Sequence, residues 1–237
     1  MSNDAIAAPH AVVTGSSGGI GRAIASHLLA QGWRVSGLDL AAPTLLSQPG
    51  FTHATVDLSQ PEDIARATAA LGDVDALVHA AGVLRVGPLG RLDHAGGELM
   101  WRLHVDAATR LADALVPAMA ARGTGGRVVF VGSRVAQGMP GRGQYAGTKA
   151  ALIALARSWA AEVADRGVTI NVVSPGATQT SMLQDPARAG SAPRLPPIGR
   201  LIQPEEIAAL AGFLLSPSAA AITGQDIAIC GGASLHR

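Results

Sequence analysis

The only tyrosine of the 237-residue chain, Tyr145, lies four positions before Lys149 in the segment QYAGTK (144–149). Residues four apart share one face of a helix, so the phenol and the ammonium would be neighbours. A phenol with an ordinary pKa near ~10 is a poor base at neutral pH, but a nearby positive charge favours the phenolate and lowers that pKa. The pair could therefore accept a proton from an alcohol or return one to a carbonyl oxygen.

A serine precedes this pair at the end of an apolar run, RVVFVGS (127–133). A hydroxyl at the end of a strand could hydrogen-bond a substrate oxygen and stabilise charge that develops on it. Ser133 is therefore the third candidate for the acid–base centre.

A glycine-rich segment, TGSSGGIG (14–21), joins a short apolar run to a helical pattern near the N-terminus. In this context Gly15 permits a tight turn, and Gly19 lets a pyrophosphate approach the backbone closely. Gly21 allows the helix to pack against the sheet. The free N–H groups at the start of the helix would bind phosphate oxygens, so the segment predicts a dinucleotide site.

Apolar runs alternate with helical patterns along the rest of the chain, which predicts right-handed crossovers and a parallel sheet. We expect a single α/β domain over residues 1–237, with a Rossmann-type doubly wound sheet of about seven strands and helices on both faces. The Pro- and Gly-rich stretch 175–203 is long for a connection and is expected to be a substrate lid. The expected strands are 11–14, 34–40, 51–58, 75–82, 127–133, 168–174 and 225–230. The later helices are expected at 61–71, 93–121, 144–166 and 203–216.

The spacing of the glycine segment and the Ser…Tyr-x-x-x-Lys arrangement together resemble the short-chain dehydrogenase/reductase family, over nearly the whole chain. The resemblance implies that Ser133, Tyr145 and Lys149 are catalytic and that a nicotinamide cofactor binds. Within the family, the segments AAGVLRVG (80–87) and NVVSPGATQTSM (171–182) look most like dihydrodiol and cyclic-alcohol dehydrogenases, such as 2,3-dihydro-2,3-dihydroxybenzoate dehydrogenase.

An acidic residue at the end of the second strand, Asp39, indicates which cofactor is used. A carboxylate there accepts hydrogen bonds from the ribose hydroxyls and repels a 2′-phosphate. No Lys or Arg in the glycine segment offsets that repulsion, so NAD is favoured over NADP. The residues expected to bind the cofactor are Gly15, Ser17, Gly19, Ile20, Gly21, Asp39, Asp57, Leu58, Ala80, Ala81, Gly82, Tyr145, Lys149, Pro175, Gly176, Thr178 and Thr180.

Two histidines stand where the family usually has asparagine. His79 begins HAAG (79–82) and is interpreted as a structural, hydrogen-bonded residue. His104 aligns with the asparagine that holds a water linking the lysine to solvent, and Asp106 is a less favoured occupant. A histidine can also hold a water and can titrate near neutral pH, so His104 is expected in a modified proton relay; the alternative is that it fills space.

The loop before the tyrosine also departs from the family pattern. Eleven residues separate Ser133 from Tyr145, one fewer than is usual, and Gly138, Gly141 and Gly143 could absorb the deletion.

The substrate side carries arginines on loops where such folds bind ligands. Arg85, Arg134 and Arg142 could pair with a substrate carboxylate, or could be solvated surface residues. The favoured function is NAD-dependent oxidation of a small, cyclic secondary alcohol. The alternatives are an NADPH-dependent carbonyl reductase of the 3-oxoacyl type and a catalytically silent cofactor-binding regulatory protein.

The composition restricts the partners. A net charge of +1 and an aromatic content of 3% argue against nucleic acid, and no apolar run is long enough to cross a membrane. The single cysteine, Cys230, is expected to be a buried, inert thiol. One cysteine excludes an internal disulfide and a cysteine-rich metal site, so no metal is expected. A lone thiol also fits a cytoplasmic protein. The family resemblance implies a homotetramer or homodimer built on the helices at 93–121 and 144–166.

Overall fold

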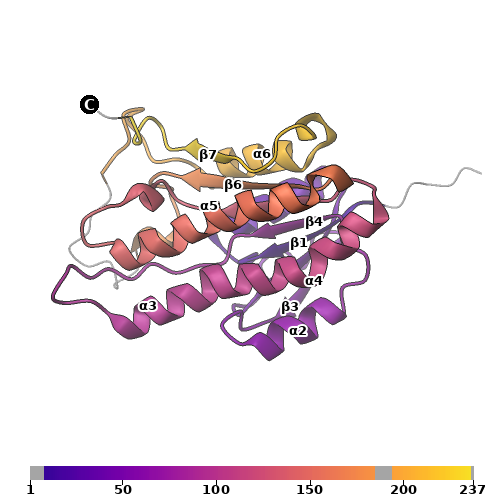
Figure 1. Ribbon diagram of the computed structural model, residues 1–237, viewed down its shortest axis with the longest axis horizontal. Helices are drawn as coiled ribbons and strands as arrows, with labels where there is room; N and C mark the ends of the chain where they lie inside the picture. The colour runs from indigo at the N-terminus through magenta and orange to yellow at the C-terminus, as the bar shows by residue number, and fades with distance from the viewer. Residues whose placement is uncertain (1–7, 185–193, 236–237) are drawn as a thin grey trace, which may run out of the picture.

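The protein is described here by a computed structural model, which covers residues 8–184 and 194–235 (Figure 1). Seven parallel strands form one sheet in the order β3-β2-β1-β4-β5-β6-β7. Their bounds are β1 (His10–Thr14), β2 (Arg34–Asp39), β3 (Phe51–Thr55), β4 (Ala76–His79), β5 (Arg127–Val131), β6 (Thr169–Pro175) and β7 (Asp226–Ile229). The strand order reverses direction between β1 and β4, which creates the crevice where doubly wound folds bind ligands. The predicted fold class is confirmed.

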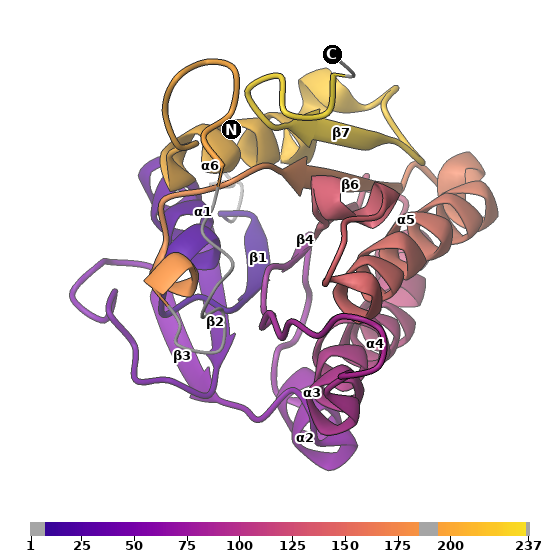
Figure 2. The ribbon, with the colours of Figure 1, turned by 90° about the vertical axis from the view of Figure 1, so that its left-hand side faces the viewer.

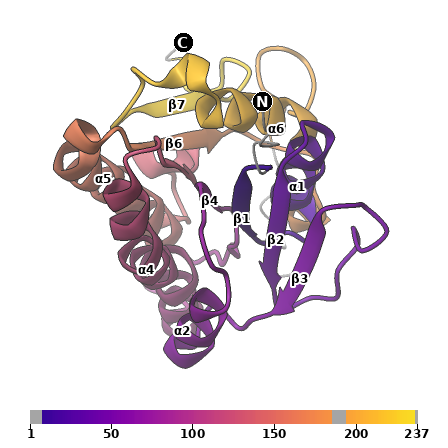
Figure 3. The ribbon, with the colours of Figure 1, turned by 90° about the vertical axis from the view of Figure 1, so that its right-hand side faces the viewer.

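Helices cover both faces of the sheet, as Figure 2 and Figure 3 show from opposite sides. On one face lie α1 (Gly19–Ala30) and α6 (Pro204–Leu215). On the other lie α2 (Pro61–Ala69), α4 (Ala107–Arg122) and α5 (Gly143–Val163), and α3 (His94–Trp101) precedes α4. No helix in the described ranges is long and apolar enough to span a bilayer.

Strand β5 shows how the sequence produces a sheet with helices packed on both faces. Val128 and Phe130 pack into the apolar core beneath α4 and α5. Val129 and Val131 face the opposite core beneath α1 and α6. Successive side chains of a strand point to opposite faces, so a continuous apolar run is what a strand buried on both sides requires.

The long helical region predicted at 93–121 is interrupted by a π-helical segment, Arg102–Asp106, between α3 and α4. The first helix of this region, α3, is capped by Asp93, whose side chain accepts a hydrogen bond from the Gly96 N–H. A π-helical turn widens the helix and is frequent at functional sites. This segment places His104 in the interior of the chain, next to α5.

The stretch predicted as a lid, 175–203, is closed at its base by backbone hydrogen bonds. The Gln179 N–H donates to the Ile202 carbonyl at 2.9 Å, and the Ile202 N–H donates to the Ala177 carbonyl at 2.9 Å. A short 3₁₀ helix, Ser181–Gln184, follows the first anchor. The middle of the predicted lid, residues 185–193, lies outside the described residues.

Candidate active site

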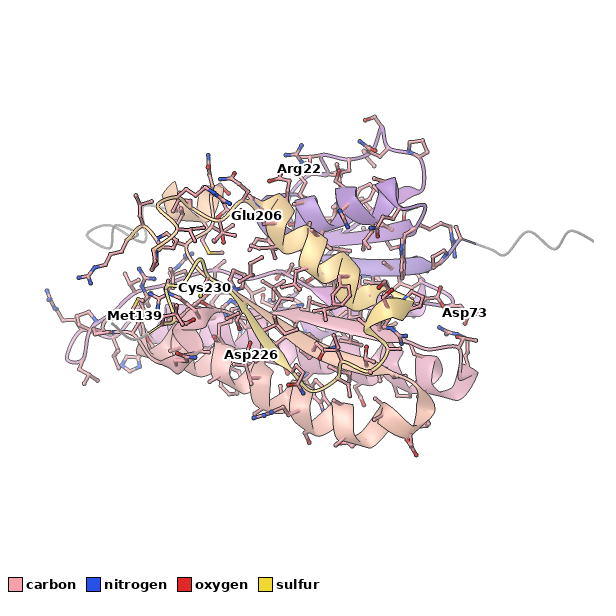
Figure 4. The ribbon with its side chains drawn as sticks, turned by 90° about the horizontal axis from the view of Figure 1, so that it is seen from above. Arg22, Asp73, Met139, Glu206, Asp226 and Cys230 are labelled. Atoms are coloured by element: carbon pink, nitrogen blue, oxygen red, sulfur yellow. The ribbon has the colours of Figure 1, made fainter. Side chains whose placement is uncertain are left out.

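A cavity of about 1380 Å³ opens beside the carboxyl ends of the strands. Figure 4 shows Met139 and Cys230 toward this end of the sheet, and Asp73, which precedes β4, toward the other. All residues that the sequence predicted to contact the cofactor line the cavity, and so do Ser133 and His104. The cavity is thus one continuous site that reaches from the glycine loop to the predicted acid–base centre.

The glycine loop has no room for side chains at two positions. A Cβ atom added to Gly21 would lie 2.2 Å from the carbonyl oxygen of Gly15. One added to Gly15, whose φ is +68°, would lie 2.9 Å from the Ala81 Cα. Glycine is therefore required at both positions for the loop to pack against the backbone that follows β4, as the pyrophosphate site of a dinucleotide fold demands.

The Thr14 hydroxyl joins the ends of β1 and β4 beneath the cavity. Its oxygen accepts hydrogen bonds from the N–H groups of Ala80 (3.0 Å) and Ala81 (3.1 Å). Its hydrogen is then donated to Nδ1 of His79 (2.9 Å), and Nε2 of His79 donates to the Leu103 carbonyl (3.0 Å). Burial lowers the pKa of His79 to about 3, so the ring is neutral. His79 is the structural histidine that the sequence predicted.

Asp39 lines the cavity, and its carboxylate is held by two backbone groups. Its two oxygens accept hydrogen bonds of 2.9 Å from the N–H groups of Ser17 and Ala41. Both donors orient the carboxylate without neutralising it, and the residues present therefore fit the ribose of a dinucleotide. Asp57 also lines the cavity, but one of its oxygens accepts hydrogen bonds from the backbone and hydroxyl of Ser59 at 2.9 and 2.7 Å.

Ser133, Tyr145 and Lys149 all line the cavity, and the side chains of Ser133 and Lys149 are buried. The Lys149 ammonium nitrogen lies 5.8 Å from the centre of the Tyr145 ring and donates to the Val131 carbonyl at 2.8 Å. Burial lowers the pKa of Lys149 to about 7. The Ser133 oxygen accepts a hydrogen bond from the Val135 N–H at 3.2 Å, which orients the hydroxyl at the end of β5.

His104 is fully buried behind the tyrosine, and protein groups contact both of its ring nitrogens. The Val83 N–H donates to Nε2 at 3.1 Å, and Nδ1 lies 2.8 Å from the Thr148 hydroxyl. Its ring stands edge-to-face against Tyr145, with 5.6 Å between the ring centres. Asp106, the other residue considered for this role, forms an ion pair with Arg110 at 2.9 Å.

Glycine turns allow the loop between Ser133 and Tyr145 to be one residue shorter than is usual in the family. Gly138 and Gly141 have φ angles of +101° and +73°, which favour glycine, and Gly143 begins α5. The Gly87 N–H donates to the Gly141 carbonyl at 2.9 Å, so this loop is tied to the loop that follows β4. Tyr145 thus reaches the cavity despite the shorter connection.

The predicted substrate arginines do not all reach the cavity. Arg134 and Arg142 line it, whereas Arg85 does not, so a substrate contact at Arg85 stays a prediction that the cavity does not support. The Arg85 guanidinium donates to the Leu84 carbonyl at 3.1 Å, and its stem lies against Gly96 of α3. A loop position at the carboxyl edge is therefore not enough to direct a side chain inward.

Several residues of the cavity carried no recognisable signal in the sequence. They come from the loop before α5, from the predicted lid and from the chain after β7, and they include Met139, Leu183, Arg194, Leu195, Ala233 and Leu235. Cys230 is buried, as predicted, with its sulfur 3.0 Å from the Ser234 hydroxyl. Among the described residues, no group of three or more His, Cys, Asp or Glu side chains is arranged to hold a metal ion.

A doubly wound sheet, a glycine loop after its first strand, and a serine, tyrosine and lysine in one cleft define a class of protein. They are the parts of a nicotinamide-dependent oxidoreductase that acts on CH–OH groups. The nicotinamide group supplies or takes the hydride when it is bound.

Comparison with known proteins gives the family. A family model described as enoyl-(acyl carrier protein) reductase matches residues 15–234. A solved structure of a short chain dehydrogenase/reductase family protein is 34% identical, with a TM-score of 0.88 over 96% of this chain and 98% of that one. The chain belongs to the short-chain dehydrogenase/reductase family.

Two curated relatives have activities that their names state. The 3-oxoacyl-(acyl-carrier-protein) reductase FabG of Escherichia coli (strain K12) is 37% identical over 94% of this chain and 96% of its own length. D-threitol dehydrogenase of Mycolicibacterium smegmatis is 33% identical over 94% of this chain and 91% of its own. These relatives are a ketoreductase and a polyol dehydrogenase rather than the dihydrodiol dehydrogenases that the sequence suggested.

Proposed function

We propose that this protein is an NAD(H)-dependent oxidoreductase that interconverts a 3-oxoacyl-type ketone and the corresponding secondary alcohol. Support for the substrate comes from the FabG relatives and from the cavity, which has the volume for a cofactor together with a chain-like substrate. Apolar side chains of Met139, Leu183 and Leu195 line the cavity and would contact an acyl chain.

The chemistry that we propose uses three side chains. Tyr145 gives its phenolic proton to the ketone oxygen, or takes it back from the alcohol. The Ser133 hydroxyl donates a hydrogen bond to the same oxygen and stabilises its developing charge. Lys149 in its charged form stabilises the phenolate and can bind a ribose hydroxyl of the cofactor.

The cofactor preference rests on Asp39. Its carboxylate is fixed by the N–H groups of Ser17 and Ala41, so it cannot move aside without losing two hydrogen bonds. The carboxylate would repel a 2′-phosphate next to it. The glycine segment 14–21 contains no Lys or Arg that would offset this repulsion. Solved relatives carry either cofactor: a polyketide ketoreductase, 26% identical, was solved with NADPH, and a 3-ketoacyl-(acyl-carrier-protein) reductase, 25% identical, with NADH.

The test measures kcat/KM for reduction of acetoacetyl-coenzyme A with NADH and with NADPH. We expect NADH to be preferred by at least ~10-fold, and Asp39→Ser to reduce that preference. Tyr145→Phe should lower kcat by ~10²–10⁴-fold while the affinity for NADH is retained, because it removes only the proton donor. Preference for NADPH would refute the cofactor proposal. Equal hydride transfer by wild type and Tyr145→Phe would favour a catalytically silent protein.

A second candidate is NAD-dependent oxidation of a small secondary alcohol, such as a polyol or a cyclic alcohol. It is favoured by the D-threitol dehydrogenase relative and by the same Asp39 carboxylate. A panel of polyols, cyclic alcohols and dihydrodiols offered with NAD⁺ would separate it from the first. A kcat/KM on this panel that exceeds the value for 3-hydroxybutyryl-coenzyme A would support this second candidate.

A further inference from the structure

The hydrogen bonds around His104 fix which of its nitrogens carries the proton. A backbone N–H can only donate, so Nε2, which faces the Val83 N–H at 3.1 Å, must be the unprotonated acceptor. The proton of the neutral ring is then on Nδ1 and is donated to the Thr148 oxygen at 2.8 Å. Thr148 donates its own hydrogen to the Tyr145 carbonyl at 2.8 Å. The direction of all three bonds is therefore determined.

The surroundings keep the His104 ring neutral. Burial lowers its pKa well below the usual value, and the nearby charge of Lys149 on α5 acts in the same direction, as does His79 on β4. Protonation would also place a hydrogen on Nε2 against the Val83 N–H, so two donors would face each other. Neither nitrogen is left to hold a water or to pass a proton.

The three hydrogen bonds connect the parts that must stay aligned during hydride transfer. Val83 follows the predicted cofactor contact Gly82 in the loop after β4, and a Cβ on Gly82 would lie 2.6 Å from Nε2 of His104. Thr148 lies on α5 between Tyr145 and Lys149. The imidazole therefore spans the space between the cofactor loop and the catalytic helix, and its ring packs against that of Tyr145.

We propose that Thr148 and His104 are positioning residues that form a non-titrating brace between the cofactor loop and Tyr145, in place of a proton relay through the histidine. Thr148 sets the tautomer of His104, and His104 sets the place of the tyrosine ring. The proposal rests on the proposed role of Tyr145 as the acid–base residue and adds Thr148 to the residues on which that role depends.

The test compares Thr148→Val, which has the same shape but no hydroxyl, with Thr148→Ser, which keeps the hydroxyl. We expect Thr148→Val to lower kcat by ~10- to 100-fold, because small misplacements of catalytic groups have effects of that size. The KM for NADH should change by no more than about threefold, and Thr148→Ser should retain most of the wild-type kcat. Thr68→Val is the matched control, since Thr68 also bonds a carbonyl of its own helix but lies on α2.

The pH profile separates a brace from a relay. For a brace, log kcat of Thr148→Val lies below that of wild type by the same amount from pH 5 to 8, and ¹⁵N resonances of His104 show an Nδ1–H tautomer that does not titrate. Titration of His104 in this range, or a Thr148→Val enzyme with wild-type kcat, would overturn the proposal. If Thr148→Val does not fold, Thr148→Ala gives the same comparison without an apolar group facing Nδ1. An inactive wild type would instead count against the proposed function.

Discussion

The Lys149 ammonium lies in the interior of the chain, where burial lowers its pKa to about 7, against an ordinary value of 10.5. The hydrogen bond to the Val131 carbonyl uses one of the three N–H donors of the ammonium. Lys149 therefore gains or loses its charge near neutral pH, and its electrostatic effect on Tyr145 changes with it. This is a common property of catalytic lysines.

We expect the free energy of unfolding of the cofactor-free protein to rise with pH between about 7 and about 10.5. In this window the unfolded chain keeps the Lys149 proton and the folded chain has released it. Urea unfolding of wild type and Lys149→Met from pH 7 to 9.5 measures the effect. The variant should show a smaller rise, and identical slopes would contradict the burial of the ammonium.

Burial of His79 affects the free energy of unfolding at acidic pH. Its folded-state pKa of about 3 lies below the ordinary 6.5, so its contribution to stability is complete above pH 6.5 and is lost as the pH falls toward 3. His79→Asn should be less stable than wild type at pH 7, because it loses a buried contact, but should lose less stability on acidification. The exposed His94 gives the control His94→Asn, which should follow the wild-type curve in thermal unfolding from pH 7 to 4.

The proposed catalytic residues could be predicted because their types and spacing are typical of the chemistry, whereas the position of Thr148 and the direction of the Arg85 side chain could not. A threonine before a lysine has no distinctive pattern, and its role appears only when His104 is seen 2.8 Å away on another element. The inward or outward direction of an arginine on a loop depends on packing, here against Gly96.

Among the elements, the link between β1 and α1 has the strictest requirement for small residues. Gly21→Ala should destabilise the protein by at least ~1–3 kcal/mol, because the new Cβ would lie 2.2 Å from the Gly15 oxygen. Gly18→Ala is the matched control three residues earlier, where a Cβ meets no atom within 4 Å. Denaturant unfolding measures both variants. Equal stability of the two would show that the loop can rearrange.

The strands and helices were predicted in type and order, since each has a clear period, and their ends differ by a few residues. The strand expected at 51–58 ends at Thr55 because the next residues turn toward α2. The π-helical segment 102–106 was not predicted, because its apolar spacing continues that of the helices on either side. His104 in this segment contacts both the loop after β4 and α5, and such contacts between distant segments are not visible in the sequence.

For the whole molecule, the family resemblance predicts a homotetramer or homodimer that buries the outer faces of α4 and α5. Small exposed residues on these faces, such as Ala114, Ala118 and Ala154, would allow close approach of a second copy. Ala154→Arg should therefore reduce the mass measured by light scattering, and Ala65→Arg, an exposed position on α2, should not. A wild-type monomer would refute this prediction directly.

The backbone bonds that join Gln179 to Ile202 have a consequence for how this protein could change its substrate. The segment between these anchors leaves and re-enters the domain at one place. We therefore expect insertions or deletions between the anchors to cost little stability, since in general each doubling of loop length adds only ~0.6 kcal/mol of closure entropy. We expect that grafting this segment from a relative would change the substrate preference and leave unchanged the cofactor preference and the acid–base role that we propose for Asp39 and Tyr145.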